Sequence, residues 1–296
     1  MPETDSPKLF GRSALSGAAR VAGVIGWPIA HSLSPRLHGF WLDRHRVDGV
    51  YVPLAVKPGM LGRALIGLSA LGFAGANVTI PHKEDACALV DEVSDLALRI
   101  GAVNTIVVRS DGRLFGTNTD AFGFIANLEA GCPGWRADAG PAVLLGAGGA
   151  ARAIAVALIE AAAPALVIVN RDQGRAERLA AKLGPAGVRV EPWAKRAEVA
   201  GEAALLVNAT SLGMAGKPPL DIDLAALPGE AVVTDIVYAP LVTPLLAAAG
   251  ARGNRTVDGL GMLLHQARPA FQAWFGIDPE VSPELRRHVE QGLRPS

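Results

Sequence analysis

The chain has 296 residues, half of them hydrophobic, and 28 Lys and Arg balance 28 Asp and Glu, so its formal net charge is zero. This length is typical of two domains, each large enough to bury a core of its own. Charge balance argues against a nucleic-acid partner, because binding phosphates requires a basic excess. Two cysteines (Cys87 and Cys132) are too few for a disulfide framework, and the six histidines show no metal-ligand spacing. We therefore expect a metal-free protein of the reducing cytoplasm.

Neither a leader nor a membrane segment is predicted. Met1–Ser6 contains acids rather than a basic start before an apolar core, so no signal peptide is expected, and residues 1–20 form an extension before the first strand. The most apolar stretch, residues 142–169, is interrupted by Gly, Arg, Glu and Pro. A membrane-spanning helix needs about 20 predominantly apolar residues. The stretch predicts instead the strand, turn, helix and strand of a buried α/β unit.

The first half of the chain alternates short extended runs with helical ones. The tripeptide Ser110-Asp111-Gly112 is a turn signal between two of the extended runs and predicts a hairpin. Strands are predicted at residues 21–25, 50–56, 76–80, 105–109 and 114–118. Helices are predicted at residues 35–46, 59–71, 83–90 and 94–98.

Residues 131–141 mark the clearest change of composition, with three glycines and two prolines, and are interpreted as a loop between domains. Beyond them, strands alternate with helical segments, which predicts a parallel sheet covered by helices. These strands are expected at residues 142–145, 166–170, 188–191, 205–208 and 232–236. Two helices are expected near the end, at residues 262–274 and 283–292.

A glycine-rich turn follows the strand predicted at residues 142–145. The segment Gly146-Ala147-Gly148-Gly149-Ala150-Ala151 has the form GxGxxG/A and leads into a helix over residues 152–160. The first glycine permits a tight turn, the second lets the backbone approach a pyrophosphate, and the last small residue lets helix and strand pack closely. Free N–H groups at the helix start then face the phosphates. The strand–turn–helix–strand context predicts a dinucleotide site.

The end of the next strand indicates which dinucleotide. NAD sites usually place an acid there, about 20 residues after the glycines, for the ribose 2′-hydroxyl. Here Asn170 occupies that place, and Arg171 and Arg175 are positioned to clamp a 2′-phosphate, which favours NADP. Asp172 leaves two possibilities open: it caps the following helix, or it reaches the ribose and admits NAD.

Polar clusters in the first half predict a substrate site. Ser32 and Ser34 precede a helix that starts with proline, so Ser34 either binds a ligand or caps the helix. Asn77 and Thr79 lie on one face of an apolar strand, and polar groups buried there need partners. Lys83 follows the turn after this strand, and Asn104 adds another amide. Asp120 adds a carboxylate at the end of a strand-like run close to the proposed domain junction, where small-molecule sites usually form.

These motifs resemble those of shikimate dehydrogenases. SLSP, NVTIPHK, GAVNT, GTNTDAFG, GAGGAARA, NR, NATSLGM, DIVYAP and DGLGMLLHQA occur here in that family's order and cover nearly the whole chain, from about residue 24 to residue 274. The resemblance implies a fold of two α/β domains. One is a substrate and catalytic domain formed by residues 1–120 and 259–296, with the C-terminal helices returning to it. The other is a Rossmann-type NADP-binding domain formed by residues 121–258.

The resemblance also implies residue roles. Lys83 and Asp120 look like the catalytic pair. The substrate residues it implies are Ser32, Ser34, Asn77, Thr79, Asn104, Tyr238 and Gln266. The cofactor residues it implies are Gly146, Ala147, Gly148, Gly149, Ala150, Asn170, Arg171, Arg175, Thr210, Gly259 and Met262. Two departures are notable. Gly39 stands where the family often has Asn, which is expected to alter helix packing, and Asp172 stands where NADP-preferring members often have Thr.

The implied activity is reversible, NADPH-dependent reduction of 3-dehydroshikimate to shikimate, in the biosynthesis of aromatic amino acids. In the implied mechanism Lys83 stabilises the charge that develops on the carbonyl oxygen and donates the proton, while Asp120 orients the lysine. Three alternatives are an NAD-using quinate/shikimate dehydrogenase, a non-catalytic NADP-binding sensor and a tetrahydrofolate-type dehydrogenase. Asn170 and Arg171 argue against the first, although Asp172 leaves it open. The intact Lys83–Asp120 pair argues against the second, and the SLSP serines argue against the third. The expected partner is a small molecule, without nucleic acid or membrane, bound by a monomer or homodimer.

Overall fold

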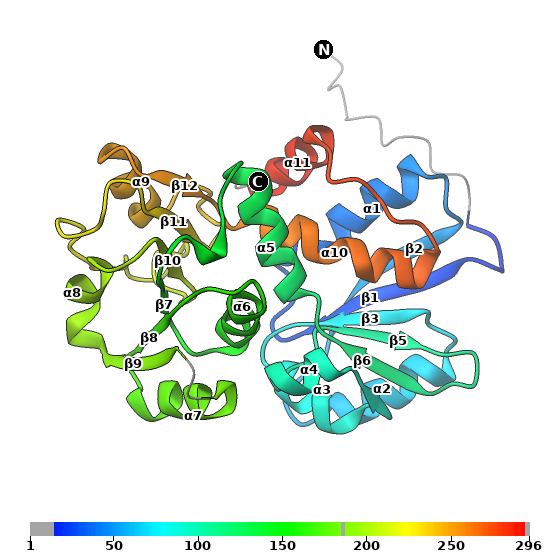
Figure 1. The fold of residues 1–296 in the computed structure, drawn as a ribbon. Coiled ribbons are helices and arrows are strands. Elements are labelled where there is room, and N and C mark those ends of the chain that lie inside the picture. Colours follow the sequence, from blue (N-terminus) through cyan, green and yellow to red (C-terminus); the bar gives the residue numbers. More distant parts are fainter. Residues whose placement is uncertain (1–14, 185–186, 294–296) are drawn as a thin grey trace, which may run out of the picture.

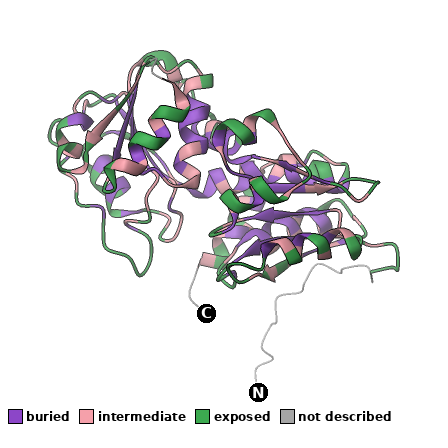
Figure 2. Cartoon of the chain, turned by 90° about the horizontal axis from the view of Figure 1, so that it is seen from below, coloured by how far each residue is buried: buried purple, intermediate pink, exposed green. Residues whose placement is uncertain are grey.

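The computed structural model describes residues 15–184 and 187–293, which form two lobes of roughly equal size (Figure 1). Each lobe is built around one six-stranded sheet. Strands are buried at the centre of each lobe, and the exposed residues lie mainly on the outer faces of the helices (Figure 2). The interpretation of Met1–Ser6, and most of the extension expected over residues 1–20, lie outside the described residues.

The first sheet is mixed. Its strand order is β2-β1-β3-β5-β6-β4, with β1 parallel to β2 and β3, and with β5 antiparallel to both β3 and β6. The hairpin predicted around Ser110-Asp111-Gly112 is confirmed as the β5–β6 pair. The strands are β1 (Arg20–Gly26), β2 (Gly49–Ala55), β3 (Gly75–Val78), β4 (Glu92–Val93), β5 (Thr105–Val108) and β6 (Leu114–Thr117). The strand expected over residues 76–80 therefore ends earlier, at Val78.

This order brings several turns to one edge of the sheet. Because β5 is antiparallel to both of its neighbours, the ends of β3 and β6 lie at the same edge as the start of β5. The end of β1 lies there too, since β1 is parallel to β3. Polar residues that are far apart in the sequence therefore meet at this edge.

Helices cover both faces of the first sheet. One face packs against three helices, and the core between them contains Leu37, Trp41, Phe271 and Trp274. These helices are α1 (Ser34–Arg44), α10 (Leu260–Phe275) and α11 (Pro283–Glu290), so the C-terminal helices return to the first lobe. The other face packs against α2 (Leu61–Ala70), α3 (Lys83–Leu89) and α4 (Asp95–Ile100).

The second sheet is entirely parallel, as predicted, with the order β9-β8-β7-β10-β11-β12. This is the doubly wound arrangement in which ligands bind where the strand order reverses, here between β7 and β10. The strands are β7 (Ala142–Leu145), β8 (Leu166–Asn170), β9 (Val188–Pro192), β10 (Leu205–Asn208), β11 (Val232–Asp235) and β12 (Arg255–Val257). Its helices are α6 (Gly149–Glu160), α7 (Gln173–Leu183), α8 (Arg196–Ala200) and α9 (Pro244–Ala251).

Helix α5 (Asp120–Gly131) carries the chain from one lobe to the other (Figure 1). It starts at the edge of the first sheet, and its Phe124 and Leu128 enter the core of the second lobe. The loop expected between domains at residues 131–141 is therefore not the crossing, because Cys132 and Trp135 already pack in the second lobe. A glycine- and proline-rich stretch indicates a loop, but the chain can pass from one domain to the other in a helix that precedes that loop.

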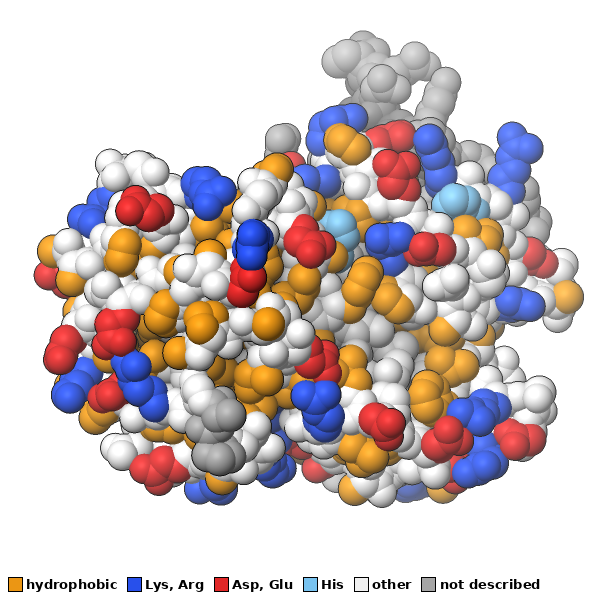
Figure 3. Space-filling view, viewed as in Figure 1, with side chains coloured by type: hydrophobic (Ala, Val, Ile, Leu, Met, Phe, Trp, Pro, Cys, Tyr) orange, Lys and Arg blue, Asp and Glu red, His pale blue; other side chains and the backbone are white. Residues whose placement is uncertain are grey.

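Among the described residues, every helix is too short or too polar to cross a membrane. Within the same part of the chain, His, Cys, Asp and Glu side chains form no group of three that could hold a metal ion. Side chains of both charge signs are interspersed over the two lobes on the face shown in Figure 3.

Candidate active site

The site is centred on an ion pair between Lys83 and Asp120. The lysine Nζ donates to Asp120 Oδ2 at 2.5 Å, and the two side chains are only 18% and 8% exposed. Lys83 is the first residue of α3 and comes shortly after β3, while Asp120 is the first residue of α5 and comes shortly after β6. The strand order therefore brings the pair together, and the start of α5 favours a carboxylate at Asp120.

Asn104 holds the second oxygen of Asp120. Its Nδ2 donates to Asp120 Oδ1 at 2.8 Å and also lies within hydrogen-bond distance of Thr119 Oγ1 and Gln266 Oε1. Its Oδ1 accepts from the backbone N–H of Thr119 at 2.8 Å. Asn104, which is 2% exposed, thus fixes the carboxylate on the side away from Lys83. The expected site residues Lys83, Asn104, Asp120 and Gln266 form one connected cluster.

Asn77 adjoins this cluster and is held by three partners. Its Nδ2 donates to Asn104 O and to Thr105 Oγ1, and its Oδ1 accepts from the Tyr51 hydroxyl at 2.7 Å. The sheet register explains the last contact, because Tyr51 and Asn77 lie on the strands that flank β1 on either side. Burial raises the pKa of Tyr51 well above its ordinary value, and the nearby Ser34 side chain offsets part of that rise. Tyr51 therefore remains a hydrogen-bond donor to Asn77.

Ser32 and Ser34 lie after β1, at the same edge of the sheet. The Ser32 Oγ accepts from the backbone N–H of Ser34 at 3.3 Å. The possibility that Ser34 caps α1 is wrong, because the helix begins at Ser34 and the cap position is Leu33. A Cβ added at Gly39 would meet nothing within 4 Å, and the change in helix packing expected from the missing Asn side chain stays a prediction.

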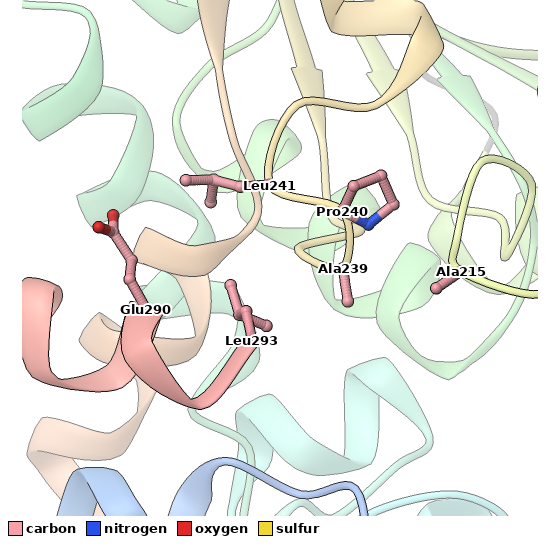
Figure 4. A pocket seen from close by; sticks show the side chains of 6 residues that line it. All are labelled: Ala215, Ala239, Pro240, Leu241, Glu290 and Leu293. Carbon is pink, nitrogen blue, oxygen red and sulfur yellow. The ribbon is translucent and has the colours of Figure 1, made fainter. Parts of the chain in front are cut away.

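Two other expected substrate residues lie around this edge. Thr79 follows β3, and its backbone N–H donates to Ile25 O. Tyr238 comes from the second lobe but packs against the core of the first, and burial raises its pKa. A pocket of about 630 Å³ borders the Tyr238 loop and is lined by both lobes (Figure 4). None of the expected site residues lines it. The residues that do are Ala215, Ala239, Pro240, Leu241, Glu290 and Leu293.

The glycine-rich turn lies between β7 and α6, as its sequence predicts. Gly146 has φ +117°, and a side chain there would lie 2.9 Å from Ala209 O, so only glycine fits between the two loops. A side chain on Gly148 would meet nothing within 4 Å, which leaves open space in front of the turn. A Cβ on Gly149 would lie 3.9 Å from Lys83 Cδ, so the turn faces the catalytic candidate across the lobes.

The remaining residues expected beside the cofactor lie near the point where the strand order of the second sheet reverses. The Thr210 hydroxyl donates to Asn208 Oδ1 at 2.7 Å, which holds the loop after β10 against the turn at Gly146. Ala147 is buried and Ala150 lies in the first turn of α6. Gly259 and Met262 lie at the start of α10, with Met262 in the core of the second lobe.

The end of β8 carries the three residues expected at the adenosine ribose. Asn170 is the last strand residue, Arg171 is exposed, and Arg175 lies in the first turn of α7. Asp172 caps α7, because its Oδ1 accepts from the backbone N–H of Arg175 at 2.9 Å. Of the two possibilities that the sequence left open, helix capping is thus the one seen. The carboxylate is directed toward the helix start.

Several residues of the site escaped the sequence analysis. Tyr51, Thr105 and Thr119 belong to the hydrogen-bonded cluster, but each is an ordinary strand or turn residue in the sequence. Glu84, next to Lys83, forms ion pairs with Arg152 and Arg175 of the second lobe. His82 is buried, and its Nε2 lies within hydrogen-bond distance of Val56 O, at 2.7 Å.

Comparison with protein families gives three matches along the chain. Residues 24–106 match the shikimate dehydrogenase substrate binding domain, residues 136–214 match the shikimate / quinate 5-dehydrogenase family, and residues 259–283 match the shikimate 5′-dehydrogenase C-terminal domain. The first and third matches correspond to the first sheet with its C-terminal helices, and the second covers the glycine-rich turn and the residues at the end of β8.

Similar proteins cover nearly the whole chain. A shikimate dehydrogenase (NADP(+)) of Rhodospirillum rubrum is 63% identical over 278 residues, which is 93% of this chain and 98% of that protein. The structure of shikimate 5-dehydrogenase from Thermus thermophilus in complex with NADP(H) and shikimate is 40% identical, with a TM-score of 0.82 over 92% of this chain and 99% of that one. Quinate dehydrogenase from Corynebacterium glutamicum in complex with NAD is 33% identical, with a TM-score of 0.85 over 92% and 99%.

Proposed function

The chain belongs to the shikimate dehydrogenase family, and we propose that it catalyses the reversible NADPH-dependent reduction of 3-dehydroshikimate to shikimate, in aromatic amino-acid biosynthesis. The observation that carries the proposal is the contact between the two halves of the site. The Lys83–Asp120 pair lies at the edge of the first sheet, and the glycine-rich turn of the second sheet approaches Lys83 there. An acid–base pair beside a dinucleotide turn is the arrangement that a carbonyl reductase requires.

The residues around the turn fit NADP. The open space in front of Gly148 and the start of the twelve-residue helix α6 suit a pyrophosphate. Arg171 and Arg175 would hold the 2′-phosphate, with Asn170 in place of the acid that NAD sites usually carry. The Asp172 carboxylate is engaged as the cap of α7, where its Oδ1 accepts from the Arg175 N–H. When bound, the cofactor supplies the hydride.

The substrate would lie over the edge of the first sheet. We assign its carboxylate to Ser32 and Ser34, and its ring hydroxyls to Asn77, Thr79, Asn104 and Gln266, with Tyr238 closing from the second lobe. The hydroxyls of Ser32 and Ser34 can each donate a hydrogen bond to the carboxylate. The connected amide cluster supports the assignment further, because it presents fixed donors and acceptors.

Lys83 and Asp120 would provide the protein's own contribution to the reaction, which is charge stabilisation and proton transfer. The lysine ammonium stabilises negative charge on the C3 oxygen of the substrate and donates the proton to it in the reduction. Asp120 holds Nζ at one oxygen, while Asn104 holds the other oxygen. The proton acceptor in the reverse direction is the same pair. Holding the substrate against the cofactor in the reactive geometry should supply most of the rate enhancement.

Initial rates of shikimate and quinate oxidation, each with NADP and with NAD, test the proposal. We expect strong activity with shikimate and NADP alone. Comparable rates with NAD or quinate would instead make the chain a broader quinate/shikimate dehydrogenase, and no activity with any pair would favour a cofactor-binding sensor. The proposal needs no second subunit, so it holds for a monomer or a homodimer, and we place the enzyme in the cytoplasm.

Replacing Lys83 by Ala tests the role of the pair. Turnover should fall by orders of magnitude while the KM for shikimate changes little, because the lysine acts in the transition state. Asp120→Asn should be similarly damaging while the fold is retained. Near-normal turnover of folded Lys83→Ala protein, verified by circular dichroism, would contradict the assignment.

A further inference from the structure

Glu84 joins the two lobes beside the proposed active site. It is the second residue of α3, directly after Lys83, and its side chain is 47% exposed. Its Oε2 lies 3.2 Å from an Arg152 guanidinium nitrogen, and its Oε1 lies 3.5 Å from one of Arg175. Both arginines belong to the second lobe, on α6 and α7. One carboxylate of the first lobe therefore divides its two oxygens between two arginines of the other.

The two ion pairs differ in strength. The Arg152 side chain is only 16% exposed and lies beside Gly101 at the end of α4, so it is enclosed between the lobes. Arg175 is 43% exposed, and its distance to Glu84 is longer. An exposed, long ion pair contributes little and is readily exchanged, whereas an enclosed pair is retained. Of the two partners, Arg175 is the one that Glu84 can release.

We propose that Glu84 is a specificity-determining residue that competes with the 2′-phosphate of the cofactor for Arg175. This inference rests on the proposed function, in which Arg175 belongs to the phosphate clamp. If Arg175 binds the phosphate, it either gives up its contact with Glu84 or holds the Glu84 carboxylate close to a group of like charge, and both outcomes weaken phosphate binding. Glu84 therefore reduces the preference of the site for NADP over NAD. It also couples the position of Arg175 to α3, the helix that carries Lys83.

The test is the affinity of the apoprotein for adenosine 2′,5′-bisphosphate, with adenosine 5′-monophosphate as the probe that lacks the 2′-phosphate. Isothermal titration calorimetry measures both without turnover. We expect Glu84→Gln to bind the bisphosphate about two- to fivefold more tightly, the factor that one exposed ion pair contributes, and the monophosphate unchanged. In an Arg175→Ala background the same replacement should have no effect on either probe.

Two variants control for charge and for contact between the lobes. Asp85→Asn removes the same charge from the next residue of α3. Glu160→Gln removes another ion pair between the lobes, in which Arg99 contacts Glu160 at 2.5 Å. Both should leave the affinity for the bisphosphate unchanged.

Several outcomes overturn the inference. They are equal or weaker binding of the bisphosphate by Glu84→Gln, an equal gain in Asp85→Asn, or a gain that persists without Arg175. If the unmodified protein binds both probes equally, the phosphate clamp itself fails, and the proposed cofactor preference fails with it. A clear preference for the bisphosphate without an effect of Glu84→Gln overturns the inference alone.

Discussion

Replacing Gly123 by Ala should disable the site by forcing apart two helices that carry site residues. Gly123 lies one turn after Asp120 on α5, against Gln266 of α10. A Cβ at Gly123 would lie 2.5 Å from Gln266 Cβ and 2.7 Å from its backbone nitrogen. Ordinary contacts between carbon atoms are about 3.5–4.0 Å. The two helices must therefore separate by about 1 Å, because backbone atoms cannot turn aside as a side chain can.

The magnitude follows from the contacts that this separation stretches. Overpacking of this kind costs about 1–3 kcal/mol, against a gain of about 1 kcal/mol from replacing glycine inside a helix. The free energy of unfolding should therefore fall by up to about 2 kcal/mol. The hydrogen bond from Asn104 to Gln266, already 3.3 Å long, would break. A 1 Å displacement of a catalytic group costs about a hundredfold in rate, so kcat/KM for shikimate should fall by about that factor.

Urea denaturation followed by circular dichroism and steady-state kinetics measure the two effects. Gly39→Ala is the matched control, since Gly39 also lies inside a helix but a Cβ there meets nothing within 4 Å. It should raise the free energy of unfolding by a few tenths to about 1 kcal/mol and leave kcat/KM unchanged. If Gly123→Ala behaves like Gly39→Ala in both assays, the close approach of α5 and α10 does not position the site.

Two further predictions concern the hydrogen bonds and the burial behind the site. Tyr51→Phe removes the donor to Asn77 Oδ1 and leaves a buried acceptor unpaired, so the free energy of unfolding should fall by about 1–3 kcal/mol. The KM for shikimate should rise while the KM for NADP stays constant. An unchanged KM for shikimate would refute this role of Tyr51. Burial lowers the pKa of His38 from its ordinary 6.5 to about 3. Between these two pH values only the unfolded chain binds a proton at His38. The free energy of unfolding should therefore fall by about 1.4 kcal/mol for each unit by which the pH decreases below 6.5. Urea midpoints at pH 7.5 and 5.5 measure this loss, which His38→Gln should reduce; equal losses in both proteins would refute it.

Local patterns predicted the strands well because buried parallel strands are short apolar runs bounded by turns. The strands expected at residues 142–145, 166–170 and 205–208 are found at those bounds. Helix α5 was not predicted, because its start overlaps a polar turn and its Gly123 weakens a helical pattern. The two-residue strand β4 depends on its pairing with β6, which no local pattern reveals.

In the candidate site, too, local sequence patterns predicted some residues and not others. The glycine-rich turn and Lys83 lie in motifs that carry their own signal in the sequence. Tyr51 does not, because its role depends on β1 lying between β2 and β3. Glu84 was likewise invisible, since its partners Arg152 and Arg175 come from the other lobe. Contacts fixed by the strand order and by the meeting of the lobes require the three-dimensional structure.

The return of α10 and α11 to the first lobe has a consequence for synthesis on the ribosome. The second sheet is complete once residue 257 has emerged, although its lobe is encoded later. The first sheet still lacks one of its covering layers at that moment, because the core around Leu37 and Trp41 includes Phe271, Leu285 and Val289. Domains generally fold as units in order of synthesis. In this chain the lobe that is synthesised first is therefore the one that completes its folding last. A polypeptide truncated before α10 would leave the apolar face of the first sheet exposed to aggregation and to chaperones.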